Sequence, residues 1–282
     1  MHKAGAPLSL GRALTSTILA HFRRAAWLGL LSLAACAPVH APALNVPSDD
    51  ARSAVASLRT AELLPAAPTA GTARYQADRQ VFLATRKLQG TPRWTLAQQD
   101  VDYATPKLMG DFSCAMGVSL DAAKLPKLAA LVDATSSAAD ASTAPAKKAN
   151  QRQRPFLIDE GATCQSTAQL AKSFDYPSGH ATRGWAVGLV LSELAPDRAS
   201  DLLLRSRAFA DSRVVCGVHN LSAIEAGAMN GASVVAVLHA SEAFQTQLAA
   251  ARVELADYRK TAPSNAGAQC SAEHALIEAT PY

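Results

Sequence analysis

The stretch PSGHATRGWAVGLVLSELAP, residues 177–196, decides the fold class because its pattern is that of one long helix with recognisable ends. Ser178 is a residue type that caps helix N-termini well. At the other end Ala195 precedes Pro196, which is a normal stop because proline disfavours helical geometry in the residue before it. No alternation of apolar and polar residues, which would indicate a strand, occurs in the stretch.

Similar helical patterns lie on both sides of this stretch, and Asp197 is a good N-cap residue for the helix that follows it. Alanine is abundant and aromatic residues are only 5% of the chain, a composition that favours helices over sheets. The sequence contains no alternating strand pattern and no internal repeat. We therefore expect an all-α, single helical-bundle domain, with helices over residues 75–88, 92–101, 104–118, 125–139, 178–194, 197–215, 222–239 and 243–258.

The 282 residues are 49% hydrophobic and 18% charged, which excludes a disordered or fibrous chain because there is ample apolar surface to bury. The formal net charge is +4, from 27 basic and 23 acidic residues. Four of the 27 basic residues and none of the acidic ones lie within residues 1–36, so the rest of the chain carries 23 of each. A neutral domain gives no support for binding a nucleic-acid polymer, which requires a basic surface.

The N-terminus has the layout of a secretory signal. Arg23 and Arg24 precede the apolar run 25–35, which is too short to span a bilayer. The sequence LAAC at 33–36 resembles a bacterial lipobox, in which the cysteine, here Cys36, is lipidated and becomes the mature N-terminus. Ordinary cleavage after the VHA of residues 39–41 is the alternative and leaves no lipid. Either reading predicts an exported, periplasmic protein, anchored to the outer membrane if Cys36 carries lipid.

These patterns divide the chain into four parts. Residues 1–36 are the predicted signal peptide, and residues 37–71, rich in proline and alanine, are expected to form an extended tether. Residues 72–260 are the predicted helical domain. Residues 261–282 form a C-terminal segment that is rich in loops apart from a short run near Glu273.

Four cysteines follow the signal peptide: Cys114, Cys164, Cys216 and Cys270. An even number in an oxidising compartment predicts two disulfides, and the sequence leaves three connectivities open. No pair has the spacing of a zinc site, so we expect no metal ligands among them.

Three short segments carry the candidate functional residues. Singly, they are typical of a solvated charged face, a helix cap and a structural histidine. Together they supply three permanent cations, a helix N-terminus and two histidines, a set suited to a phosphate group. The residues are Lys147 and Arg154 in the first segment, Ser178, Gly179 and His180 in the second, and Arg213 and His219 in the third.

Each residue type has a physical reason to be there. Arginine offers forked donors that match phosphate oxygens. At a helix N-terminus the unpaired N–H groups and the helix dipole favour an anion, and Gly179 lets the backbone approach closely because it has no Cβ. Histidine side chains exchange protons near neutral pH, so one of His180 and His219 can act as nucleophile and the other as acid.

The order and spacing of these segments resemble a known signature. Lys-x6-Arg-Pro at 147–155, Pro-Ser-Gly-His at 177–180 and Ser-Arg-x5-His at 212–219 resemble the three-part motif of the type-2 phosphatidic acid phosphatase superfamily. Within it, the sequence is similar above all to the bacterial class A non-specific acid phosphatases, also in the stretch FSCAMG at 112–117. The likeness extends over about residues 72–255.

The resemblance implies the all-helical fold of the vanadium haloperoxidases and a periplasmic enzyme that hydrolyses small-molecule phosphomonoesters with broad specificity. It implies no metal or other cofactor, and a homo-oligomer, most simply a dimer. Carried over by motif, His219 resembles the nucleophile that forms a phosphohistidine, and His180 the acid that protonates the leaving alcohol. The groups that would hold the phosphoryl oxygens are Lys147, Arg154, Arg213, Ser178 and the N–H of Gly179.

One position departs from the family pattern. The family continues His-x-x-x-Asp, where the Asp holds the nucleophilic imidazole, but this chain has Ala223 there. Water, a backbone carbonyl or Glu225 would then have to serve His219, although Glu225 also fits a capping box with Ser222. Loss of an orienting Asp in a related triad costs about 10⁴ in rate. We therefore expect Ala223→Asp to raise kcat.

The missing Asp also keeps a second function open, a degenerate homologue that binds phosphate or phosphorylated ligands with weak or no turnover. A vanadium-dependent peroxidase is a third, because the sites are related, but the wider resemblance is to phosphatases. Lipid phosphatases of the superfamily usually have several membrane-spanning helices, and this sequence contains no run of 18 or more uninterrupted apolar residues.

Overall fold

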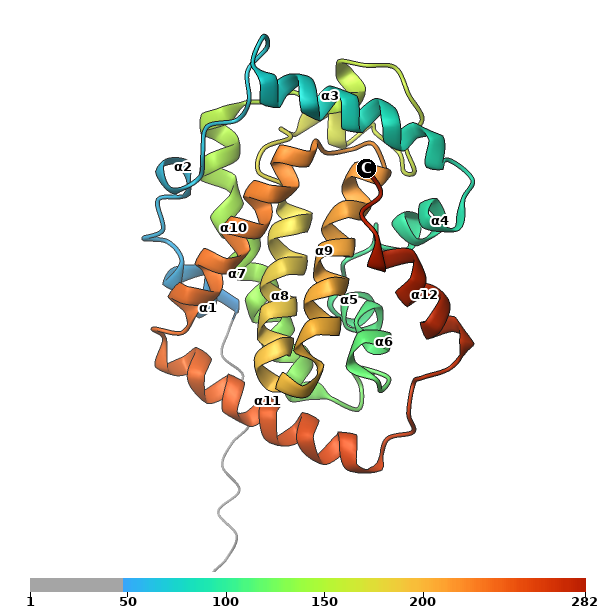
Figure 1. The fold of residues 1–282 in the computed structure, drawn as a ribbon. Helices are drawn as coiled ribbons and strands as arrows, with labels where there is room; N and C mark the ends of the chain where they lie inside the picture. Colours follow the sequence, from blue (N-terminus) through green and yellow to red (C-terminus); the bar gives the residue numbers. More distant parts are fainter. Residues whose placement is uncertain (1–47) are drawn as a thin grey trace, which may run out of the picture. The chain divides into compact units, whose positions relative to one another are not determined.

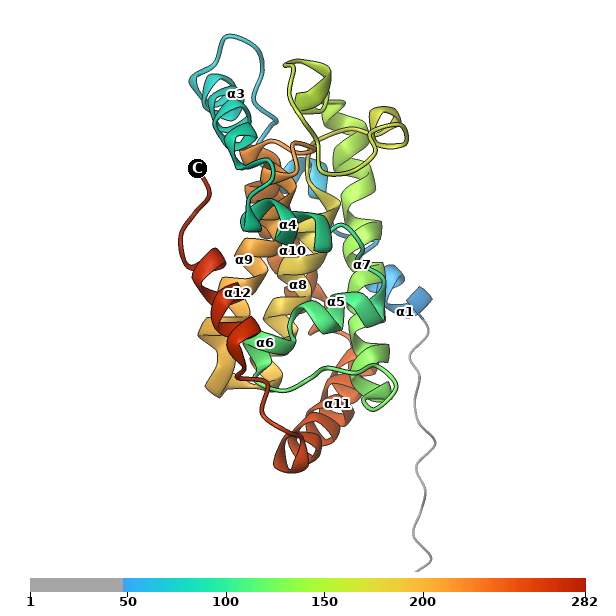
Figure 2. The ribbon, with the colours of Figure 1, turned by 90° about the vertical axis from the view of Figure 1, so that its right-hand side faces the viewer.

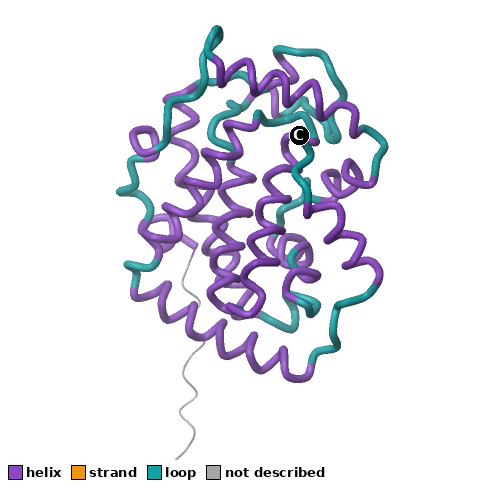
Figure 3. The backbone as a smooth tube through the Cα atoms, in the orientation of Figure 1, coloured by secondary structure: helices purple, strands orange, loops and turns teal. Residues whose placement is uncertain are grey.

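The computed structural model describes residues 48–282, and every regular element in that part of the chain is a helix (Figure 3). The only strand-like pairing within these residues is a single bridge between Val118 and Ser264. The predicted all-α class is therefore confirmed. The predicted signal peptide, Cys36 and the first part of the predicted tether lie outside the described residues.

Three helices that follow one another in the chain form the centre of the bundle. Helix α8 (Gly179–Leu194) lies between α9 (Ala199–Val215) and α10 (Leu221–Leu238), as Figure 1 shows. Helix α7 (Pro126–Asn150) packs on α8 and α10, and α11 (Glu242–Thr261) crosses the lower end of the bundle (Figure 1, Figure 2). Large apolar side chains fill the interior, among them Phe112, Leu128, Leu131, Val187, Leu191 and Phe209.

Glycines let α8 approach both of its neighbours closely. A Cβ at Gly188 would lie 1.6 Å from Ser206 Oγ on α9, and a Cβ at Gly231 on α10 would lie 2.6 Å from the carbonyl oxygen of Thr182. Neighbouring atoms in a close-packed interior cannot yield that much space. The close spacing of the three central helices therefore depends on glycine, which has no side chain, at these contacts.

The remaining helices are shorter and surround this centre: α1 (Ser48–Ala54), α2 (Thr60–Leu63), α3 (Ala73–Thr85), α4 (Pro92–Gln99), α5 (Thr105–Asp111), α6 (Ser113–Met116) and α12 (Ala268–Glu278). Four 3₁₀ turns lie in the connections between helices: η1 (Arg86–Leu88) between α3 and α4, η2 (Pro155–Leu157) and η3 (Leu170–Lys172) between α7 and α8, and η4 (Pro196–Arg198) between α8 and α9. Figure 1 shows α3 crossing the upper end of the bundle.

The structure differs from the expected tether. Residues 48–64 are not extended, because α1 and α2 pack on α7 and bury Ala51 and Val55. This segment has too few apolar positions for a helical period to stand out in the sequence. In residues 261–282 the short run near Glu273 is the helix α12, which packs on α9 and buries Ile277.

Three expected helices also have different bounds. Residues 104–118 form two helices that are separated at Phe112, and Gly117, with φ of 80°, ends the second in a left-handed conformation. Helix α7 continues through Pro145 to Asn150. The apolar pattern in the sequence ends earlier, because small buried residues rather than large apolar ones line the second half of the helix. Asp197 is not the N-cap of α9, because it lies in η4 and its carboxylate pairs with Arg259.

By length and composition alone, α10 is the one helix of the described chain that is apolar enough to cross a membrane. Half of it is buried inside the bundle, where it packs on α7, α8 and α9. This central position accounts for its apolar character.

The two predicted disulfides are confirmed, and their connectivity is Cys114–Cys270 and Cys164–Cys216. The first joins α6 to α12, so it ties the C-terminal helix to the body of the bundle. The second joins the loop after η2 to the C-cap of α9.

The ends of four core helices meet at the upper end of the bundle in Figure 1. Helices α7 and α9 end there, α8 and α10 begin there, and the long connection between α7 and α8 lies over them. Backbone groups at helix ends lack partners within their own helix, so this end offers polar groups that the apolar body of the bundle does not.

Candidate active site

A cavity of about 370 Å³ opens at this end of the bundle. Ser178 is fully buried at the N-cap of α8, where its hydroxyl accepts a hydrogen bond from Ala181 N, and its side chain does not line the cavity. The other six residues that the motifs predict all line it: Lys147, Arg154, Gly179, His180, Arg213 and His219.

A larger cavity, about 600 Å³, lies beside the Cys114–Cys270 disulfide. Its two arginines, Arg198 and Arg259, already pair with Asp201 and Asp197. The smaller cavity is the candidate site, because three of its cations, Lys147, Arg154 and Arg213, form no salt bridge with any residue of the described chain.

The three cations of the site come from different elements. Lys147 lies in the last turn of α7, and its Nζ donates to a backbone carbonyl at 2.5 Å. Arg154 lies in the following loop and donates to Ser173 O through Nε. Arg213 lies in the last turn of α9, and its Nη2 donates to Gln165 Oε1 at 2.6 Å. Its Nε and Nη1 are buried without a hydrogen-bond partner in the described chain, so two donors remain for a ligand.

Burying these cations without an anion is unfavourable. Burial first, and then the charge of Arg154, lowers the pKa of Lys147 to about 8 and that of Arg213 to about 9. Burial also lowers the pKa of Arg154. An anion in the cavity would offset these shifts, because an opposite charge stabilises the charged form of each group. The electrostatics of the cavity therefore favour an anionic ligand.

His219 is held at both ring nitrogens. Nδ1 lies 2.9 Å from Asp175 Oδ1, and Nε2 lies 3.0 Å from Arg154 Nη1. A guanidinium can only donate, so Nε2 must be the acceptor and the ring proton must reside on Nδ1. This tautomer leaves a lone pair on the nitrogen next to the cationic groups, which is what a nucleophile requires.

Asp175 therefore supplies the carboxylate that the sequence analysis sought after His219. The expectation that water, a backbone carbonyl or Glu225 would serve Nδ1 is wrong. Glu225 is exposed and pairs with Arg74 at 2.9 Å. Ala223 is fully buried and lies in α10, which begins at Leu221, so His219 precedes the helix and the helical four-residue spacing does not describe the pair.

The predicted capping box of Ser222 and Glu225 is also absent from this helix. Asn220 is the N-cap of α10, and its side chain donates to Asp175 instead of capping the helix. Ser222 lies inside the first turn, where its N–H and its hydroxyl both donate to the carboxylate of Asp78.

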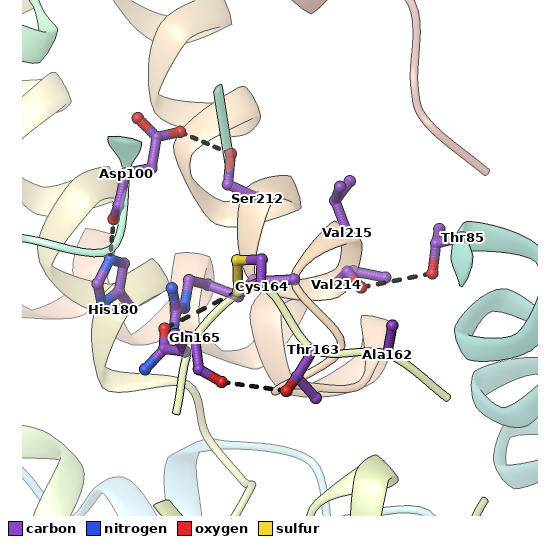
Figure 4. Close-up of a disulfide and its surroundings, with 12 residues drawn as sticks. Thr85, Asp100, Ala162, Thr163, Cys164, Gln165, His180, Ser212, Val214 and Val215 are labelled. Carbon is purple, nitrogen blue, oxygen red and sulfur yellow. Dashed lines mark hydrogen bonds between the residues drawn. A yellow bond between two sulfur atoms is a disulfide. The ribbon is translucent and has the colours of Figure 1, made fainter. Parts of the chain in front are cut away.

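His180, in the first turn of α8, is held through Nε2, whereas the carboxylate partner of His219 contacts Nδ1. Its Nε2 lies 2.6 Å from the backbone carbonyl oxygen of Asp100 (Figure 4). A carbonyl can only accept, so this nitrogen carries a proton and Nδ1 is left for exchange with a ligand. The ring stacks on Phe209 at 4.9 Å between centroids and meets the ring of Tyr103 edge-on at 4.8 Å.

The carbonyl that holds His180 is itself fixed. The Asp100 carboxylate accepts hydrogen bonds from Arg205 at 2.5 Å and from Ser212 Oγ at 2.6 Å (Figure 4). Ser212, the serine of the third motif, thus ties α9 to the segment that orients His180.

Both histidines favour their neutral forms while the cavity holds no anion. Burial lowers the pKa of His219 well below its ordinary value, and the charges of Arg154 and Lys147 lower it further. Burial and then Arg213 have the same effect on the pKa of His180.

Several residues that line the cavity were not predicted from the sequence. Arg183 lies over the Tyr103 ring at 3.9 Å from its centroid and pairs with Asp140. Arg183 is three residues after His180 on one helix, so helical spacing alone could have indicated it. Asp140 and Thr143 lie seven and four residues before Lys147 on α7, so the same spacing connects them to a predicted residue. The remaining lining residues come from separate segments that no helical spacing connects: Val101, Tyr103, Gln165, Leu170 and Ser173.

The Cys164–Cys216 disulfide supports one wall of the site. It holds the loop that carries Gln165 against the end of α9 (Figure 4). Cys164 N also donates to Cys216 O at 3.1 Å. Gln165 is the hydrogen-bond partner of Arg213, so the disulfide fixes the direction of that guanidinium.

Within residues 48–282, no group of three or more histidine, cysteine, aspartate or glutamate side chains is arranged to hold a metal ion. The cavity presents Lys147, Arg154 and Arg213 instead, and their charges attract anions.

Comparisons with known proteins show the family to which the chain belongs. A model of the PAP2 superfamily matches residues 128–246, which include all three motifs. An acid phosphatase of Zymomonas mobilis is 38% identical over 208 residues, 73% of this chain and 79% of the relative. Non-specific acid phosphatases of Providencia stuartii and Salmonella typhimurium are 36% and 35% identical, over 70% and 69% of this chain and 81% and 79% of their own. At this identity and coverage, the chain belongs to the PAP2 superfamily and groups there with the bacterial non-specific acid phosphatases.

Proposed function

We propose that this protein is an acid phosphatase that hydrolyses phosphomonoesters through a phosphohistidine on His219, without a metal ion. The observation that carries the proposal is the position of His219 Nε2, 3.0 Å from Arg154 Nη1 in a cavity lined by three cations, from which the lone pair on Nε2 is inferred. The relatives named acid phosphatases support the same activity.

The first step transfers the phosphoryl group to the enzyme. The phosphoryl oxygens bind between Lys147, Arg154 and Arg213, and Arg154 Nη1 turns from His219 Nε2 to one of these oxygens. Nε2 then attacks phosphorus, so an N–P bond forms and the P–O bond to the alcohol breaks. His180, doubly protonated in the complex, gives its Nδ1 proton to the leaving oxygen and becomes neutral.

The second step releases orthophosphate. A water molecule gives a proton to Nδ1 of His180 and attacks phosphorus, so a new P–O bond forms and the N–P bond breaks. His219 returns to its neutral form with the proton still on Nδ1, and His180 is doubly protonated again. Catalysis rests on positioning and on cations around the phosphoryl oxygens, as expected for phosphoryl transfer.

Trapping the phosphoenzyme tests the proposal. The purified protein, quenched during hydrolysis of p-nitrophenyl phosphate, should carry acid-labile phosphate on His219. His219→Ala should remove both the phosphoenzyme and turnover, whereas His239→Ala, at the surface after α10, should keep both. Phosphate found on Ser178, or turnover that survives in His219→Ala, would overturn the mechanism.

Metal independence has its own test. EDTA should leave kcat unchanged, because cations of the protein neutralise the phosphoryl charge. Loss of activity in EDTA and its return with a divalent metal would contradict this part of the proposal.

The degenerate homologue suggested by Ala223 loses its main support, because Asp175 contacts Nδ1 of His219. A purified protein that binds orthophosphate but hydrolyses no phosphomonoester between pH 4 and pH 8 would favour it.

We also propose that the protein is exported through its N-terminal signal and anchored by lipid on Cys36. The two disulfides support an oxidising compartment. Mass spectrometry of the mature N-terminus should find acylated Cys36; an unmodified N-terminus after residue 41 would exclude the anchor. The dimer expected from the resemblance stays a prediction, which sedimentation of the mature protein can test.

A further inference from the structure

We propose that Asp175 is the positioning residue of His219 and that alanine at position 223 belongs to the same arrangement, because a second carboxylate has no place there. The inference rests on the proposed function, since it concerns the nucleophile of that reaction. Asp175 lies in the loop before α8 and is 44 residues from His219 in the sequence.

The Asp175 carboxylate acts only as an acceptor in its hydrogen bonds. Oδ1 accepts from His219 Nδ1 at 2.9 Å and from Asn220 N at 3.2 Å, and Oδ2 accepts from Asn220 Nδ2 at 2.9 Å. Burial raises the pKa of Asp175, while the charges of Arg152 and Arg154 and the hydrogen bonds from Asn220 lower it. The hydrogen-bond pattern fits an ionised carboxylate, which can only accept. A buried carboxylate on Nδ1 fixes the tautomer of the imidazole and stabilises the positive charge that the ring gains as the N–P bond forms.

The carboxylate is itself held in place by Arg152. Arg152 Nε lies 3.7 Å from Asp175 Oδ2, and the backbone N–H of Asp175 donates to the carbonyl of Arg152 at 2.8 Å. Arg152 also donates to Asp78 Oδ2 at 2.7 Å and to Ser222 Oγ at 2.6 Å. All these side chains are buried, so Asp175 cannot turn away from His219 without disturbing contacts that join α3, the loop and α10.

Position 223, where the family has the orienting Asp, is taken up by apolar packing and a backbone hydrogen bond. Ala223 is fully buried, packs with Tyr176 and Ala226, and accepts a hydrogen bond from Ser178 N at its carbonyl. Tyr176 is the residue after Asp175, so a carboxylate at 223 would be buried close to Asp175. Two buried like charges disfavour each other's ionisation. We therefore expect Ala223→Asp to lower kcat, the opposite of the expectation from the sequence.

Asp175→Asn tests the positioning role. With p-nitrophenyl phosphate we expect kcat to fall about 10²-fold to 10⁴-fold while KM changes only a few-fold, because the lost interaction strengthens in the transition state. Binding of orthophosphate should persist, since no phosphate contact is removed. Asp211→Asn, which removes another buried carboxylate, should leave kcat within a few-fold. An unchanged kcat in Asp175→Asn would overturn the proposal.

A second measurement requires no change at Asp175. In ¹⁵N NMR spectra of the wild-type protein, the His219 signals, assigned by their loss in His219→Gln, should show a proton on Nδ1. A proton on Nε2 would overturn the proposal even if Asp175→Asn failed to fold.

The exchange of the two positions tests the role of Ala223. Ala223→Asp alone should lower kcat, because it buries a second carboxylate near Asp175; in Asp175→Asn, where the like charge is absent, the same substitution should lower kcat less. A rise in kcat for Ala223→Asp alone would refute the exclusion of a second carboxylate.

Failure of this inference and failure of the proposed function are distinguishable. If the wild type hydrolyses phosphomonoesters and Asp175→Asn hydrolyses them equally well, only the positioning role fails. If the wild type hydrolyses none of them but its His219 carries the Nδ1 proton only while Asp175 is present, the positioning role stands and the proposed function fails.

Discussion

The two histidines of the site differ in the residue that holds each ring, and this difference separates their roles. His180 engages the Asp100 carbonyl through Nε2, and His219 engages Asp175 through Nδ1. Opposite nitrogens are therefore left for the substrate. A carbonyl partner leaves His180 able to give and take a proton at Nδ1, while a carboxylate partner makes the Nε2 of His219 more nucleophilic.

This division predicts that the effect of His180→Gln depends on the leaving group. Glutamine can keep the hydrogen bond to Asp100 but cannot give up a proton, so alkyl phosphates should lose about 10²-fold to 10⁴-fold in kcat. p-Nitrophenyl phosphate should lose much less, because nitrophenolate leaves without a proton. The measurement is kcat for a series of phosphate esters with leaving groups of rising pKa. An equal loss across the series would exclude His180 as the acid.

The motifs predicted six of the residues that line the cavity, because their order and spacing resemble the signature of a known family. Asp175 escaped notice because it lies in a loop without periodicity and its partner is distant in the sequence. The hydrogen-bond partner of His180 could not be predicted either, since it is a backbone carbonyl, which every residue type has.

The positions of the site residues depend on the close packing of α8, α9 and α10. Glycines at the contacts between these helices allow the close approach. The sequence predicted these three helices to within a few residues, since each has a long apolar pattern. It did not predict the second half of α7, which carries Lys147 but is lined by small residues, or the break at Phe112. Helix ends that depend on tertiary contacts leave a weak signal in the sequence.

Three glycines test this packing. A Cβ at Gly227 would lie 2.7 Å from Ser178 O, and one at Gly231 would lie 2.6 Å from Thr182 O, whereas a Cβ at Gly110 in α5 would meet nothing within 4 Å. Gly227→Ala and Gly231→Ala should each lower the free energy of unfolding by about 1–3 kcal/mol. Gly110→Ala should raise it by up to about 1 kcal/mol, because alanine favours a helix. Urea unfolding measures all three.

The same variants should differ in activity. Gly227 lies against the residues that begin α8, so Gly227→Ala should also lower kcat, while Gly231, one turn farther along α10, should affect kcat less. Equal stability of all three variants and the wild type would show that the close helix spacing is not required.

The whole molecule separates an apolar body from a polar end. Apolar side chains fill the space between α7, α8, α9 and α11, while buried charged and titratable groups gather around the cavity, among them Arg154, Asp175, His180, Arg213 and His219. Burial of such groups costs free energy unless they are paired. An anion that binds the native state should therefore stabilise the whole fold, and orthophosphate, vanadate or tungstate should raise Tm.

The two buried histidines make this stability depend on pH. Their pKa values are lowered well below the ordinary 6.5, so below about pH 6.5 the unfolded chain binds protons that the native protein does not. Stability from this source is present above pH 6.5 and is lost as pH falls, by up to about 1.4 kcal/mol per pH unit for each histidine. Carboxyl groups whose pKa is raised by burial, such as Asp111 at about 6, act in the opposite direction. The contribution of one histidine must therefore be isolated by comparison with a variant.

His180→Gln isolates it, because glutamine does not titrate. From pH 7.5 to pH 5, the free energy of unfolding should fall more steeply for the wild type than for His180→Gln, by up to about 1.4 kcal/mol per pH unit. Saturating orthophosphate should reduce this difference, since a bound anion raises the pKa of His180 and lets the native protein take up the proton. The same proton is the one that the leaving group requires, so substrate binding would charge the acid at low pH. Parallel pH profiles of the two proteins, with and without orthophosphate, would contradict this coupling.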